Sequence, residues 1–258
     1  NVSILCIGTE LTEGTIQDKH AKYLSSVLTG MGVTVRSITL LPDDHKVIVQ
    51  ALSNAVREVD LLITVGGLGP TSDDITRDCI SSVLDISLVF HEAHWQVLRK
   101  RFDGKIAESN RKQAMAPKGF DLLHNSQGTA PGFLGEYDET IIASLPGPPN
   151  ELKAVAEEGL WPYLQDRLGK TNINDFLLCT SLLIPESELE NAIAEYALPG
   201  ITWTTRAEEM RIVFRIFSES KEDREKVFIL LEEKYGNSCI RKGEIYPGEL
   251  LLSACRER

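Results

Sequence analysis

Residues Leu61 to Thr76 read LLITVGGLGPTSDDIT, and this segment carries the strongest indication of the fold. Its first five residues form a short apolar run, which is typical of a strand buried on both faces of a parallel sheet. The run ends abruptly at Gly66-Gly67, and the residues after Pro70 predict a helix over 72–84. The stretch therefore predicts a strand, a glycine-rich turn and a helix in direct succession.

The same alternation extends to both sides of this stretch. Apolar runs predict strands over 2–7 and 33–41, and apolar residues at helical spacing predict helices over 20–29 and 44–58. Strands that alternate with helices indicate a parallel sheet covered on both faces, which is a doubly wound α/β layer. Further along the chain, we expect a helix over 92–102, a hairpin on the sheet edge over 132–145 and a helix over 150–168.

A second, smaller α+β domain is predicted after a polar segment without periodicity at 169–175. Strands over 176–184, 201–205 and 210–217, with helices after Pro185 and over 221–235, predict a β-α-β-β-α unit. The predicted domains are thus 1–169 and 170–242. Residues 243–258 are predicted to be a linker that opens another helix at Glu249.

Composition narrows the class of protein. Hydrophobic residues make up 42% and charged residues 25% of the 258 residues, which is the balance of a folded globule. A formal net charge of -11 argues against nucleic-acid binding, because that affinity rests on Lys and Arg, but it permits a small anionic ligand at a local site. No apolar run approaches the ~20 residues of a membrane helix. With five cysteines and no C-x-x-C pair, we expect reduced thiols in a cytoplasmic protein without membrane partners.

The glycine-rich turn is the strongest candidate for a binding site. Glycines let backbone N–H groups approach a ligand closely, and the start of the following helix favours an anion, most naturally phosphate. The alternative is a tight turn without a ligand, in which Thr71 and Asp74 form a capping box. If the bound molecule carries phosphate, Asp73 and Asp74 would repel it. We therefore expect a divalent cation between these carboxylates and the phosphate, with Asp74 as the leading metal ligand.

Two other turns follow apolar strands and are expected to reach the same crevice. They are Gly8-Thr9-Glu10 and the segment from Pro146 to Glu151. Glu10, Asp18 and Glu151 would then add acidic groups, while Arg111 and Lys112 supply cations for phosphate oxygens. Taken singly, each of these residues also fits an ordinary exposed side chain or a turn before a helix.

Several motifs in a fixed order carry a family resemblance. They are GTELTEG (8–14), GGLGPTSDDIT (66–76), NRKQA (110–114), GTAPG (128–132) and LPGPPNEL (145–152). Over roughly residues 1–168 the chain closely resembles the competence/damage-inducible protein A (CinA) family. The resemblance implies the molybdopterin-binding fold for this part and a K-homology-like connecting domain for about 171–240.

The resemblance also implies an activity, which is metal-dependent hydrolysis of the pyrophosphate bond of ADP-ribose with Mg²⁺, Mn²⁺ or Co²⁺. In this interpretation Asp74, with Asp18 or Asp73, holds the metal, and Arg111 stabilises the leaving phosphate. The residues expected at the ligand are Gly8, Thr9, Glu10, Gly66, Gly67, Gly69, Pro70, Thr71, Ser72, Asp73, Asn110, Gln113, Gly132, Gly147, Pro148 and Glu151. The alternatives are a protein that binds molybdopterin or a nucleotide without hydrolysis, and a structural module.

The chain departs from the family at one point. Asp18-Lys19-His20 stands where family members commonly have N-T-N, and Asp18 matches an active-site aspartate of the molybdenum-cofactor enzymes. The alternative is an aspartate at the start of a helix with His20 merely exposed. The second unit has no G-x-x-G loop, so we expect a packing or dimerisation module, and a homodimer, rather than an RNA binder. Many family members carry a further domain that deamidates nicotinamide mononucleotide, and we expect no such activity in this chain.

Overall fold

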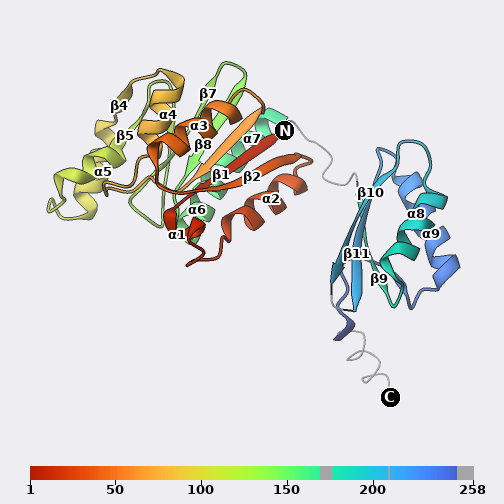
Figure 1. The fold of residues 1–258 in the computed structure, drawn as a ribbon. Coiled ribbons are helices and arrows are strands. Elements are labelled where there is room, and N and C mark those ends of the chain that lie inside the picture. The colour runs from red at the N-terminus through yellow and green to blue at the C-terminus, as the bar shows by residue number, and fades with distance from the viewer. Residues whose placement is uncertain (169–175, 209, 249–258) are drawn as a thin grey trace. The chain divides into compact units, whose positions relative to one another are not determined.

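The computed structural model describes residues 1–168, 176–208 and 210–248. The chain divides into two compact units, residues 1–171 and 172–258, and each is described by itself (Figure 1). The predicted boundary at 169–175 and the predicted helix from Glu249 lie outside the described residues.

The first unit is built on a mostly parallel sheet with the strand order β2-β1-β3-β8-β7-β6. Strand β1 (Val2–Ile7) pairs in parallel with β2 (Val35–Leu41) and β3 (Leu61–Val65), and β3 pairs in parallel with β8 (Thr140–Leu145). This confirms the doubly wound α/β layer, because buried apolar strands of this kind need a cover on both faces.

The predicted hairpin exists, but it does not form the edge of the sheet. Strand β7 (Gly132–Tyr137) pairs antiparallel with β8, while β8 lies inside the sheet beside β3. Strand β6 (Asp121–Leu123), which the sequence did not predict, pairs with β7 and forms the edge. The position of β8 follows from its burial, since an almost fully buried strand is more stable between two neighbours than at an edge.

Helices cover both faces of this sheet (Figure 1). One face carries α2 (His20–Gly30) and the continuous run of α6 (Pro149–Val155), the π-helical turn η2 (Ala156–Leu160) and α7 (Trp161–Leu168). The other face carries α3 (His45–Ala55) and α4 (Thr76–Leu84).

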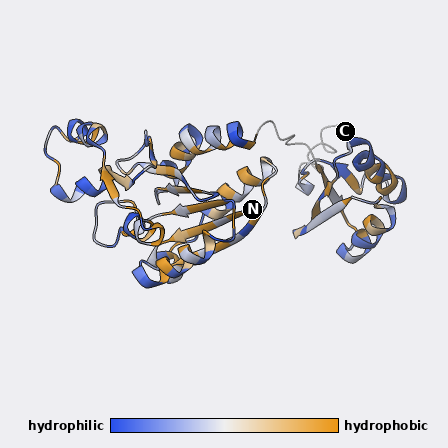
Figure 2. Cartoon of the chain, turned by 90° about the horizontal axis from the view of Figure 1, so that it is seen from above, coloured by the Kyte–Doolittle hydropathy of each residue, from blue (hydrophilic) through white to orange (hydrophobic). Residues whose placement is uncertain are grey.

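Strand β3 shows how one strand serves both layers. Ile63 and Val65 pack into the core under α2 and α6, and Leu62 packs into the core under α3 and α4. Side chains alternate between faces along a strand, and each buried Leu or Ile contributes roughly 1.5–3 kcal/mol. In Figure 2 the strands of the first unit are drawn largely in the colours of apolar residues.

Helix α4 begins at Thr76, four positions after the predicted Ser72. The intervening residues bond to one another instead, because Asp74 N–H donates to Thr71 O at 3.3 Å and Thr71 N–H donates to Asp74 Oδ2 at 2.9 Å. The remaining elements of this unit are α1 (Thr9–Thr12), β4 (Leu88–Phe90), α5 (Glu92–Arg101), the 3₁₀ helix η1 (Glu108–Ala114) and β5 (Met115–Pro117).

The described residues of the second unit form an antiparallel sheet in the order β10-β11-β9-β12 with two helices packed on one face. Its elements are β9 (Phe176–Leu182), α8 (Glu186–Tyr196), β10 (Thr202–Glu208), β11 (Arg211–Phe217), α9 (Lys221–Tyr235) and β12 (Ile240–Lys242). The predicted order of elements is present, and β12 is added to it.

The first residues of the predicted linker are bonded to this second sheet. Gly243 N–H donates to Leu178 O at 2.7 Å, and Ile245 N–H donates to Thr180 Oγ1 at 3.0 Å. Within the described residues, no helix combines the length and the apolar character that a bilayer crossing requires.

Candidate functional site

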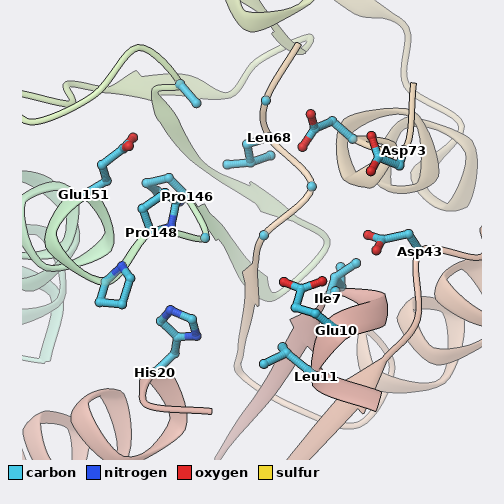
Figure 3. A pocket seen from close by; sticks show the side chains of 18 of the residues that line it. Ile7, Glu10, Leu11, His20, Asp43, Leu68, Asp73, Pro146, Pro148 and Glu151 are labelled. Carbon is cyan, nitrogen blue, oxygen red and sulfur yellow. The ribbon is translucent and has the colours of Figure 1, made fainter. Parts of the chain in front are cut away.

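A cleft of about 620 Å³ lies at the carboxyl ends of β1, β3 and β8. The turns that follow these three strands contribute Gly8, the segment Gly66–Pro70 and the segment Pro146–Pro149 to its walls. This is the position in which open α/β sheets bind ligands. In Figure 3, Glu151, Pro146 and His20 lie to the left of the cleft and Asp73 and Asp43 lie to the right.

Glycine is required at the first two positions of the central turn. Gly66 and Gly67 have φ values of 95° and 65°, a region that other residues rarely adopt. A Cβ atom on Gly66 would collide with Ile7 O, and one on Gly67 would collide with Thr76 Oγ1. The chain therefore follows a path after β3 that only glycine permits at these two positions, and this path brings backbone groups to the cleft.

Three consecutive amides of this turn are available to a ligand. The N–H groups of Gly67, Leu68 and Gly69 have no acceptor among the described residues, and all three residues line the cleft. Successive unpaired backbone N–H groups in a turn form a concave site for an anion. These three amides are therefore free to donate to a ligand.

Two carboxylates stand on the loop directly after these amides. Asp73 and Asp74 both line the cleft, and the Thr71 hydroxyl donates to both of them. The hydrogen bond from Thr71 is the main reason why the pKa of Asp73 is lowered, so this carboxyl stays ionised. Lys112 secures the loop from η1, because its Nζ donates to Thr71 O and, at 3.1 Å, to Asp74 O.

The cleft as a whole is acidic. Its lining includes five carboxylates and one lysine, Lys19; the carboxylates are Glu10, Asp43, Asp73, Asp74 and Glu151. Two of them are tied to neighbouring turns: Asp43 Oδ2 accepts from Thr9 N–H at 2.7 Å, and Glu151 Oε2 accepts from Asn125 Nδ2 at 2.7 Å. A phosphate at the amides would therefore need a cation near Asp73 and Asp74 to balance the carboxylates.

The structure corrects the expectation that Asp18 is a metal ligand. Asp18 does not line the cleft, and its two oxygens accept from the N–H groups of His20 at 3.0 Å and Ala21 at 3.1 Å. It caps the start of α2, which was the alternative interpretation. His20 is not merely exposed, however, because its side chain is 13% exposed, lines the cleft and places Nδ1 3.1 Å from Asp18 Oδ1.

The structure also corrects the expectation that Arg111 meets a phosphate. Its guanidinium carbon lies 4.4 Å from the ring centroid of Phe90 and 5.6 Å from that of Trp95, and its Nε is 3.2 Å from Glu108 Oε1. Stacking on aromatic rings and an ion pair hold it away from the cleft. The adjacent Lys112 instead reaches the glycine-rich loop.

Most of the other predicted residues do come together. The cleft is lined by Gly8, Glu10, Gly66, Gly67, Gly69, Pro70, Asp73, Asp74, Gln113, Gly147, Pro148 and Glu151. Thr9, Thr71 and Asn110 stand behind it and hold lining residues; Asn110 Nδ2, for example, donates to Gln113 Oε1 at 2.9 Å. Ser72 is exposed beside the cleft, and Gly132 lies within β7, where a Cβ atom would meet Ser144 O at 2.6 Å.

Three further residues line the cleft although the sequence did not predict them there: Asp43, Lys19 and His20. A signal for Asp43 was present, because it follows the apolar run of β2 as Glu10 follows that of β1. Carboxyl ends of neighbouring parallel strands meet at one edge of the sheet, so both turns had to be considered together.

The acidic groups fit a cation that takes further ligands from its substrate. No group of three or more His, Cys, Asp or Glu in the described part of the chain is arranged to hold a metal ion. Asp73 and Asp74 nevertheless lie on one short loop and share the Thr71 hydroxyl. Mg²⁺ is commonly held by one or two carboxylates, water and substrate phosphates, so this pair suits such an ion.

Comparison with known proteins agrees with the fold and the motifs. The family described as "Probable molybdopterin binding domain" matches residues 3–166. A competence-damage inducible protein of Clostridium botulinum (strain 657 / Type Ba4) is 36% identical over 231 residues, which cover 84% of this chain and 55% of that protein. The chain belongs to the CinA family of competence-damage inducible proteins.

Two further CinA proteins support the assignment. A CinA-like protein of Thermosipho melanesiensis is 35% identical over 238 residues, covering 90% of this chain and 58% of that protein. The crystal structure of the protein CinA with unknown function from Thermoplasma acidophilum superposes with a TM-score of 0.60 at 26% identity, covering 66% of this chain and 98% of that one. The chain spans just over half the length of the curated relatives it matches.

Proposed function

We propose that this CinA chain hydrolyses the pyrophosphate bond of ADP-ribose or a closely related nucleotide with the help of a divalent metal ion. The observation that carries the proposal is the meeting, in one cleft, of the unpaired amides of Gly67, Leu68 and Gly69 with the carboxylates of Asp73 and Asp74. Donors for phosphate oxygens and acceptors for a cation are the two requirements of a metal-assisted phosphate site.

Each group has a separate part in the reaction. The three amides hold phosphate oxygens, and they stabilise the negative charge that grows on them as water adds to one phosphorus atom and the bond to the bridging oxygen breaks. The products are AMP and ribose 5-phosphate. Asp74 and Asp73 would hold Mg²⁺, Mn²⁺ or Co²⁺, which neutralises phosphate charge and favours the ionised form of water when bound.

The test is the release of AMP and ribose 5-phosphate from ADP-ribose with each of the three metal ions. We expect Asp74→Ala to lower kcat/KM by about 100-fold or more, because electrostatic stabilisation of the transition state is among the larger catalytic effects. Asp78→Ala is the matched control, since Asp78 lies four residues further on, is exposed and does not line the cleft. Absence of turnover with every metal, or full turnover in Asp74→Ala, would reject the proposal.

A second candidate function is binding of a molybdopterin without hydrolysis, which the family description favours. The same amides would then hold the single phosphate of the pterin. Calorimetry with molybdopterin, AMP and ADP-ribose separates the two candidates. Tight binding of the pterin without nucleotide turnover would favour binding alone, and turnover of ADP-ribose would favour the hydrolase.

A further inference from the structure

Three consecutive carbonyl groups of the glycine-rich turn, those of Gly66, Gly67 and Leu68, are bonded to the start of α4. Thr76 Oγ1 donates to Gly66 O at 2.8 Å, and Thr76 N–H donates to Gly67 O at 3.2 Å. Arg77 Nη2 donates to Leu68 O at 2.5 Å. Three consecutive peptide groups are thus fixed from one side by two adjacent residues.

This anchoring decides where the N–H groups point. In a planar trans peptide, the C=O of one residue and the N–H of the next point in opposite directions. When the carbonyls of Gly66, Gly67 and Leu68 face α4, the N–H groups of Gly67, Leu68 and Gly69 must face away from it. These three residues line the cleft, so their amides face the ligand side.

Arg77 differs from Thr76, the other anchoring residue, because its side chain carries a charge that is buried without an ion pair. The residue is 2% exposed, its Nε has no hydrogen-bond partner, and no carboxylate of the described chain forms an ion pair with it. Burial lowers the pKa of its guanidinium to about 10, and Asp74 and Asp78 act in the opposite direction, so it is charged at neutral pH. A buried unpaired charge is costly, and here it stands behind the three amides whose residues line the cleft.

The geometry points to Arg77, assisted by Thr76, as a positioning residue for the phosphate of the ligand. Arg77 fixes and polarises the Leu68–Gly69 peptide from its carbonyl side. It also supplies a positive charge that does not contact the ligand. This inference rests on the proposed function for its ligand class, an organic phosphate. A cation on the carbonyl side of a peptide strengthens the N–H on the other side as a donor. The same charge offsets part of the acidity of the cleft.

The test is an NMR titration of the wild-type chain with AMP in the presence of Mg²⁺, followed at the backbone amides of the turn. We expect the Gly67, Leu68 and Gly69 signals to move downfield as they donate to the phosphate. In Arg77→Met the Gly69 shift should shrink most, and the affinity for AMP should fall about tenfold or more, because a charge-assisted contribution is lost. In Thr76→Val, which keeps the N–H and loses the hydroxyl, the Gly67 shift should shrink and the affinity should fall about fivefold.

Two controls separate positioning from a general loss of structure. Arg224→Met removes another buried arginine, which donates to the Ser218 carbonyl in the second unit, and should leave AMP binding unchanged. Arg77→Lys keeps the charge and should recover part of the affinity. If Arg77→Met does not fold, Thr76→Val alone decides through the Gly67 amide.

Several outcomes would overturn the inference. They are wild-type amides that ignore AMP, and an Arg77→Met chain that binds AMP like the wild type with an unchanged Gly69 shift. A wild-type chain that shows the three amide shifts but releases no AMP from ADP-ribose would reject the proposed hydrolysis and support the positioning role.

Discussion

Two buried arginines, Arg77 in the first unit and Arg211 in the second, are treated in opposite ways by the fold. The Arg211 side chain is 3% exposed, and its Nε donates to Glu208 Oε2 at 2.7 Å while its Nη2 donates to Glu244 Oε1 at 3.0 Å. It also donates to Ile245 O at 2.9 Å and stacks 3.8 Å from the centroid of the Tyr246 ring. Arg77, equally buried, has one carbonyl as its partner among the described residues.

The different partners of Arg77 and Arg211 indicate different roles for the two residues. Arg211 is paired with carboxylates and a carbonyl, and these bonds hold residues 244–246 against the second sheet. Its burial is therefore explained by a structural role. Arg77 has no ion pair of the kind that stabilises Arg211, so structural contacts explain its burial less fully. Since Arg77 stands directly behind amides that open into a cleft, the missing negative charge is best supplied by a ligand on their other side.

Replacing Arg211, the arginine that is paired with carboxylates, should change the free energy of unfolding most. Arg211→Met should destabilise the second unit by about 3 kcal/mol, because Glu208 and Glu244 lose their partner and Ile245 O loses its donor. Denaturation followed by the fluorescence of Trp203, the tryptophan of that unit, measures this. AMP binding by the first unit should not change, and a loss of AMP affinity would contradict the division of roles.

A smaller loss of stability is expected from a change in the backbone of the glycine-rich turn, at Gly67. Gly67→Ala should cost about 2 kcal/mol in the first unit and abolish AMP binding, because φ is 65° and the new Cβ would displace Thr76 Oγ1. Gly14→Ala is the matched control, since Gly14 has φ 72° but open space around a Cβ. Hydrogen exchange and AMP calorimetry compare the two variants, and equal AMP binding in both would show that the turn is not the site.

Replacing Arg77, which has no ion pair, should affect stability much less than replacing Arg211. Arg77→Met should change the free energy of unfolding by no more than about 1 kcal/mol, since the loss of the bond to Leu68 O is offset by removal of a buried unpaired charge. Urea denaturation of the first unit checks this. A destabilisation as large as that of Arg211→Met would show that Arg77 is structural after all.

The smallest effect is a dependence on pH through His94. Burial lowers the pKa of His94, with further lowering by His124, His91 and Arg77 against a raising hydrogen bond at the Thr129 backbone. The unfolded chain therefore binds this proton first, so stability should fall as the pH drops below the ordinary value of 6.5 toward the lowered folded-state pKa. His94→Gln should flatten this slope, and Arg77→Met should reduce it. An unchanged slope in both variants, measured by denaturation between pH 5 and 8, would exclude His94 as its origin.

The elements with strong local signals were predictable from the sequence, and those fixed by tertiary contacts were not. The run at 61–65 and its glycine-rich turn carry their own periodicity and punctuation, so strand, turn and helix followed directly. Strand β6 has three residues and no pattern of its own; it exists because β7 offers a free edge.

The candidate site shows the same division. Arg111 and Lys112 are adjacent, and no local rule decides which of them reaches the turn. The 3₁₀ helix η1 and the aromatic pair Phe90 and Trp95 decide it, by drawing Arg111 outward while Lys112 bonds Asp74 O. The unpaired state of Arg77 was equally hidden, because it depends on which carboxylates the fold brings near.

A crystal structure of the wild-type chain with AMP and Mg²⁺ would show directly whether the three amides hold a phosphate. We expect phosphate oxygens within about 3 Å of the backbone nitrogens of Gly67, Leu68 and Gly69, with Arg77 still bonded to Leu68 O behind them. A nucleotide bound elsewhere, or bound in the cleft with its phosphates away from these three amides, would contradict this expectation.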